Sequence, residues 1–141
     1  MATSTFRSIL GFGLVFAHFV TAVTVFVFYQ RGGFLFDEMT TTIALIVPMF
    51  AAHTSVVVRY VIRNRTRRAK IKKEHLSAPF IALSSIIVLL YLSSIVAIVY
   101  LKAYNIAFST FEQFKTTLAL VETVFAVYVA SFVQSLFEGT E

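Results

Sequence analysis

Long apolar runs separated by short polar stretches are the dominant pattern along this chain. Four such runs occur, at about residues 8–29, 40–62, 77–101 and 115–137. Each reaches the roughly 20 residues that a helix rising about 1.5 Å per residue needs to cross about 30 Å of hydrocarbon. The runs are continuous rather than alternating, which favours helices over the strands of a barrel. The pattern predicts an all-α membrane protein with four transmembrane helices, in a single domain that covers residues 1–141.

The composition supports a bilayer as the solvent of this chain. Hydrophobic residues make up 58% of the 141 residues and charged residues only 13%, and 16 residues are Phe. A chain of this length cannot bury so much apolar surface in a core of its own. It also contains no cysteine. Disulfides, thiolate chemistry and Cys-ligated metals are therefore excluded.

Local signals at the short connections agree with helix boundaries there. Gly32 and Gly33 predict a turn after the first helix. Ser109, with a glutamate three residues later, predicts a capping box that leads into the fourth helix. Phenylalanines at positions 108, 111 and 114 recur at every third residue. We expect these three rings to face lipid at the membrane boundary.

Most of the positive charge lies between the second and third helices. Eight of the twelve basic residues are found there: Arg59, Arg63, Arg65, Arg67, Arg68, Lys70, Lys72 and Lys73. The positive-inside rule places this connection, residues 63–76, in the cytoplasm, together with both chain termini. Between Pro48 and Pro79 there is no Gly or Pro, so we expect the second helix to extend into the cytoplasm as a basic stalk. We expect the bacterial cytoplasmic membrane as the location.

Two interpretations of the basic stalk stay open. The simpler is topology together with attraction to anionic lipid headgroups, worth about 1 kcal/mol per basic residue near the surface. The other is a docking site for an anionic cytoplasmic partner or a nucleotide-type ligand, because five of the eight residues are Arg and Arg forks match phosphate. Aromatic residues that would stack on bases are missing from 61–75. We therefore expect no sequence-specific binding of nucleic acid.

Two histidines and one carboxylate lie near the middle of the apolar runs. They are His18, His53 and Glu122, and a helical rise of 1.5 Å per residue places them within about 10 Å of one another along the membrane normal. Each costs about 2.5 to 3.5 kcal/mol at such depth, so each should face protein or water. One alternative is a hydrogen bond that ties Glu122 to His18. The others are a ring of Glu122 around a cation pathway and a proton-accepting site.

The residues around Glu122 favour contacts between several copies of the chain. Small and polar residues, including Thr123 and Gln134, follow helical spacing along one side of the fourth helix. Small residues also recur on the third helix, and one four-helix protomer has only one interior in which to bury such faces. We therefore expect a homo-oligomer in which Glu122, Thr123 and Gln134 line the pathway.

Motifs of enzymes are missing from the sequence. It contains no HExxH, no nucleophile elbow and no glycine loop for phosphate, and its two intramembrane histidines have no carboxylate cluster beside them. We expect neither a cofactor nor a metal, and no catalytic residue. The sequence predicts an ion-conducting effector gated at its basic segment. The alternatives are a non-catalytic accessory subunit of a larger membrane complex and a small proton-coupled transporter.

Overall fold

Four helices make up the regular structure of the residues that the computed structural model describes, 3–64 and 77–137. They are α1 (Thr3–Gln30), α2 (Phe36–Asn64), α3 (Ala78–Ala103) and α4 (Phe111–Phe137). The prediction of four helices is confirmed. Both α2 and α4 begin four residues before the predicted apolar runs. Their first turns hold acidic residues, which suit the positive end of a helix dipole but do not belong to an apolar run.

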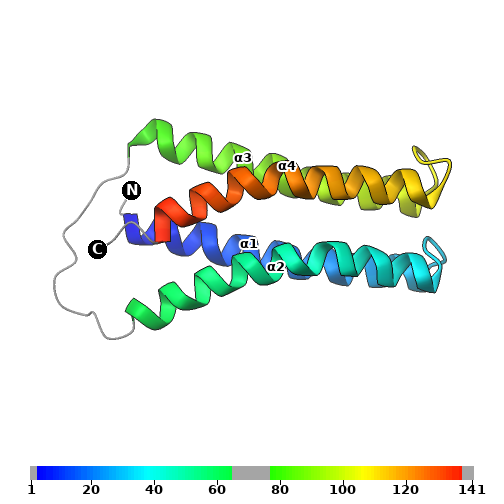
Figure 1. The fold of residues 1–141 in the computed structure, drawn as a ribbon, viewed down its shortest axis with the longest axis horizontal. Coiled ribbons are helices and arrows are strands. Elements are labelled where there is room, and N and C mark those ends of the chain that lie inside the picture. Colours follow the sequence, from blue (N-terminus) through cyan, green and yellow to red (C-terminus); the bar gives the residue numbers. More distant parts are fainter. Residues whose placement is uncertain (1–2, 65–76, 138–141) are drawn as a thin grey trace.

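The helices form two antiparallel hairpins that pack into a bundle (Figure 1). Helix α1 contacts α2 and α3, and α4 contacts α3 and α2. Along one diagonal α1 also reaches α4, whereas along the other, within the described ranges, the backbones of α2 and α3 stay apart and only side chains such as His53 and Tyr91 meet. The two short connections, 31–35 and 104–110, lie at the same end, which we call the loop end. The start of α1 and the end of α4 lie at the opposite end, which we call the far end.

Each helix buries one narrow stripe and leaves the rest of its apolar surface exposed. On α1, Leu14 is 0% exposed, whereas Phe16, two residues later, is 68% exposed. The buried stripe of α1 runs every three or four residues through Phe6, Leu10, Leu14, His18, Thr21 and Val25. Polar side chains thus lie inside the bundle, and large hydrophobic side chains lie outside. This distribution is what a lipid solvent requires.

Three of the four helices are long and apolar enough to cross a membrane, among the residues described. These segments are Ser8–Gln30, Phe36–Arg59 and Ala78–Ala103. The chain is therefore compatible with an integral membrane protein, and a fourth span in α4 stays a prediction. Helix α2 continues for five residues past its apolar segment, from Arg59 to Asn64. The rest of the predicted stalk, 65–76, lies outside the described residues.

Both helices that enter the loop end terminate in a Schellman motif. After α1, Gly32 has a φ of 79°, and its N–H donates to the carbonyl of Tyr29 at 3.0 Å. The N–H of Gly33 donates to the carbonyl of Phe28 at 2.9 Å. Asn105 adopts the same left-handed conformation after α3, with a φ of 52°. These bonds satisfy helix carbonyls that would otherwise lack donors.

The cap of α4 lies one residue later than predicted. The N–H of Gln113 donates to Thr110 Oγ1 at 3.3 Å, and the N–H of Ser109 donates to Gln113 Oε1 at 3.0 Å. Thr110 and Gln113 therefore do the work expected of Ser109 and Glu112. The sequence offers two polar residues in succession at both positions, and spacing alone cannot choose between them.

Replacing Gly33 by Ala is expected to destabilise the loop end. A Cβ atom at this position would lie 2.8 Å from the backbone oxygen of Ala103, which no side-chain rotation can relieve. We expect a loss of about 1 to 3 kcal/mol, measured as a lower midpoint of thermal unfolding in detergent. Gly13→Ala is the matched control, because a Cβ there meets nothing within 4 Å. Equal midpoints for the two variants would show that the contact with Ala103 is not tight.

Candidate functional site

One polar side chain from each helix meets in the interior, about halfway along the bundle. They are His18 of α1, His53 of α2, Tyr91 of α3 and Glu122 of α4, with exposures of 1%, 3%, 0% and 5%. We call these four residues the polar cluster. Each takes a place in the buried stripe of its helix, so the local periodicity that packs the core also turns these side chains inward. His18 and Tyr91 are each 12 residues, or about 18 Å, from the end of their helix at the loop end.

Three members of the polar cluster form a continuous chain of hydrogen bonds. His18 Nδ1 lies 2.8 Å from the carbonyl oxygen of Leu14, and its Nε2 lies 3.1 Å from Tyr91 Oη. The Tyr91 hydroxyl is in turn 2.7 Å from Glu122 Oε2. This series of hydrogen bonds therefore links α1, α3 and α4 through their side chains.

The number of protons in this chain follows from its donors and acceptors. The carbonyl of Leu14 only accepts, so His18 Nδ1 carries a proton. Tyr91 has one proton to donate. If Tyr91 donates this proton to Glu122, then His18 must be an imidazolium that donates to Tyr91 from Nε2. If Tyr91 donates it to His18, then Glu122 must be a carboxylic acid that donates to Tyr91. Both bonds are made only when His18 Nε2 and the Glu122 carboxyl hold one proton between them, in addition to the proton on His18 Nδ1.

Three polar atoms of the cluster have no hydrogen-bond partner among the described residues. They are both ring nitrogens of His53 and Glu122 Oε1, and all three are buried. The ring centroid of His53 is 5.4 Å from that of His18 and 6.4 Å from that of Tyr91. A buried polar atom without a partner costs about 1 to 3 kcal/mol, so these three atoms make the polar cluster a costly part of the interior.

Aromatic rings surround the polar cluster. Phe50 of α2 stacks on His18 with a centroid distance of 5.9 Å, and Phe125 of α4 lies 5.6 Å from Tyr91. In such apolar surroundings hydrogen bonds strengthen and charges are costly. The arrangement in which His18 and Glu122 are both neutral contains no buried charge. The ionised arrangement keeps its two charges linked through Tyr91.

The sequence predicted part of this cluster. His18, His53 and Glu122 come together as their common depth suggested. The predicted link between Glu122 and His18 exists, but it runs through Tyr91 rather than directly. The sequence reasoning missed Tyr91. The only signal for it was its position at the centre of the third apolar run, because tyrosine in a membrane helix usually marks a boundary.

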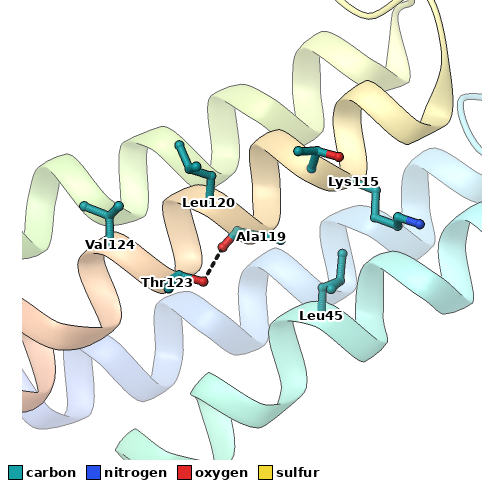
Figure 2. Close-up of a pocket in the computed structure, with 7 residues that line it drawn as sticks. Leu45, Lys115, Ala119, Leu120, Thr123 and Val124 are labelled. Carbon is teal, nitrogen blue, oxygen red and sulfur yellow. Dashed lines mark hydrogen bonds between the residues drawn. The ribbon is translucent and has the colours of Figure 1, made fainter.

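Thr123 does not lie in the polar cluster. It is exposed on α4 and lines a surface groove of about 420 Å³ with residues of α2 and α4 (Figure 2). Its hydroxyl donates to the carbonyl of Ala119 at 2.7 Å. Glu122 and Thr123 therefore face different surroundings, and one protomer does not bring them to a common pathway. The side chain of Gln134 lies outside the described residues.

The predicted basic segment lies largely beyond the described part of the chain. Arg59 is exposed near the end of α2. The side chain of Arg63 is outside the described residues, and so are Arg65, Arg67, Arg68, Lys70, Lys72 and Lys73. Contact of this segment with lipid headgroups or with an anionic partner stays a prediction.

The arrangement of side chains in the polar cluster is not that of a metal site in the described part of the chain. Within 3–64 and 77–137, no three His, Cys, Asp or Glu side chains lie close enough together to hold a metal ion. The cluster instead offers one carboxyl, one phenol and two imidazoles, all groups that bind and release protons.

Comparisons of this chain with protein-family models, with curated proteins and with solved structures gave no match.

Proposed function

We propose that this protein conducts ions across a membrane and that Glu122 is the group on which conduction depends. One observation supports the proposal: hydrogen-bonded ionisable side chains connect three helices in the interior of a bundle whose outer surface suits lipid. Ionisable residues at this depth are costly and mark ion pathways in membrane proteins. In this proposal the pathway follows the interior of each bundle.

The finer features of the proposal come from the sequence. They are four spans, cytoplasmic termini, and a basic segment at 63–76 that receives an anionic ligand or partner and gates conduction. Assembly into a homo-oligomer belongs to the same proposal. The mass of the detergent-solubilised particle tests it, because a single copy contradicts assembly. The accessory-subunit alternative has no observation in its favour and stays a prediction.

Replacing Glu122 by Gln tests the proposal directly. The change keeps the shape of the side chain but removes its charge and its acidic proton. We expect the ion flux of the purified protein in liposomes to fall by about tenfold or more. Ser131→Ala, on an exposed part of the same helix, is the control and should conduct like the wild type. Flux in Glu122→Gln equal to that of the wild type would contradict the proposal.

Ion flux of the Thr123→Val variant, measured in the same liposome assay as Glu122→Gln, distinguishes two routes for the ion. If the ion passes between copies of the chain, along the outer face of α4, the flux should fall in Thr123→Val. A pathway through the interior of the bundle depends on Glu122 and is insensitive to Thr123, which lies outside the polar cluster.

A further inference from the structure

The hydrogen-bonded side chains of the polar cluster leave no space between them for a metal cation. The heavy atoms of the chain are already 2.7 Å and 3.1 Å apart, which are hydrogen-bond distances with no space for an ion between them. Dehydrated cations need several oxygen ligands, whereas the one carboxylate oxygen without a partner here is Glu122 Oε1. A proton needs only the next lone pair.

We infer that the ion conducted is the proton and that Tyr91 relays it between Glu122 and His18. This inference rests on the proposed function. In the relay step, the acidic proton of Glu122 moves from Oε2 to Tyr91 Oη while the phenolic proton moves from Oη to His18 Nε2. The neutral pair becomes a carboxylate and an imidazolium, and Tyr91 ends with one proton, as it began. No oxidant, reductant or other reactant is needed.

His53 is the group placed to take part next. It lies on α2, whereas the three hydrogen-bonded side chains lie on α1, α3 and α4. Its two ring nitrogens are buried and without partners, and its ring centroid is 5.4 Å from that of His18. Rotation of either imidazole brings a nitrogen toward its neighbour. These contacts give the order Glu122, Tyr91, His18, His53.

All four helices contribute to the surroundings of the relay. His18 faces it from α1, His53 from α2, Tyr91 from α3 and Glu122 from α4. The ion pair between Lys102 and Glu38 lies nearer the loop end, 11 residues from Tyr91 along α3. The titratable groups in contact with Tyr91 are thus the three other members of the polar cluster.

Tyr91→Phe tests the relay because it removes one oxygen atom and keeps the ring. We measure proton entry into liposomes with an enclosed pH dye, and sodium and potassium entry in parallel. The expected result for the wild type is proton flux without sodium or potassium flux, and a loss of about tenfold or more in Tyr91→Phe. Phe125→Leu is the control, since it changes the packing on the Tyr91 ring but spares the hydroxyl. Its proton flux should stay near that of the wild type.

Two spectroscopic measurements separate a relay from a merely structural hydroxyl. Nitrogen-15 NMR of histidine-labelled protein should show His18 exchanging between neutral and doubly protonated forms in the wild type, and that exchange should vanish in Tyr91→Phe. The infrared band of the Glu122 carboxylic acid should change together with it. Proton flux of the wild type should slow in D2O.

The possible outcomes separate this inference from the proposed function. Sodium or potassium flux that is lost in Glu122→Gln, without proton flux, keeps the proposed function and overturns the proton as its ion. Proton flux that is lost in Glu122→Gln but retained in Tyr91→Phe overturns the relay alone. Liposomes that pass no ion above the empty control overturn both.

Discussion

Replacing Lys102 by Met is expected to lower the free energy of unfolding by about 3 kcal/mol, because it breaks a buried ion pair. Lys102 Nζ lies 3.1 Å from Glu38 Oε1, and the two side chains are only 11% and 15% exposed. The ammonium is also 5.8 Å from the ring centroid of Phe34 and 6.0 Å from that of Phe111. Removing it leaves the Glu38 carboxylate enclosed beside aromatic rings without its counter-charge.

Lys115→Met is the matched control for this prediction. Lys115 pairs with Glu112 at 2.8 Å, but these side chains are 37% and 70% exposed, so solvent screens the pair. An exposed pair of this kind contributes less than about 1 kcal/mol. Thermal unfolding in detergent should therefore separate the two variants by roughly 5 °C or more. Joint replacement of Lys102 by Met and Glu38 by Gln should recover part of the loss. Similar midpoints for Lys102→Met and Lys115→Met would contradict the buried pair.

The predicted apolar runs at 40–62 and 77–101 leave Glu38 and Lys102 outside, in the two short connections. Lys102 in fact continues the buried stripe of α3, four residues after Ile98 and eleven after Tyr91. Glu38 precedes the buried Thr42 by one helical turn on α2, and its Oε2 accepts the backbone N–H of Leu35. Extending each predicted helix by one turn at the loop end would have placed both charges on inward faces. A hydropathy pattern places the end of a helix at the first charged residue, whereas the helix itself continues past it.

The polar cluster shows a similar division between what sequence predicts and what requires coordinates. The depth of His18, His53 and Glu122 follows from helix rise, since both ends of each apolar run are marked. Which of them touch depends on helix rotation and on which helices are neighbours. Tyr91 lies within an apolar run, and hydropathy does not distinguish its hydroxyl from the rest of that run. The hydrogen-bonded link between His18 and Glu122 therefore cannot be predicted until the positions of the helices are known.

The three phenylalanines near the start of α4 show that a regular spacing in sequence does not by itself define a lipid-facing surface. Phe108, Phe111 and Phe114 were expected to face lipid, but Phe114 is completely buried. Its ring centroid lies 5.8 Å from that of Phe34, 5.7 Å from Phe108 and 5.5 Å from Phe111. A spacing of three residues gives one helix face only inside a helix, and α4 begins at Phe111. Phe108 belongs to the preceding loop and packs against the buried core from there.

Replacing Phe114 by Ala is therefore expected to cost about 3 to 5 kcal/mol of stability, the range for a fully buried Phe. Phe16→Ala is its matched control. That side chain is 68% exposed on the outer surface of α1, and its loss should cost about 0.5 kcal/mol. The midpoint of thermal unfolding in detergent measures both.

The difference between these two phenylalanines has a physical origin in the solvent. In lipid or detergent an exposed ring is already in apolar surroundings, so transfer out of water does not drive its burial. What Phe114 loses on truncation is contact with three neighbouring rings and the filling of the space between the hairpins. Losses of equal size in Phe114→Ala and Phe16→Ala would mean that the outer surface is covered by protein rather than lipid. A second copy of the chain on α1 would then be the first explanation to test, by comparing the particle mass of Phe16→Ala with that of the wild type.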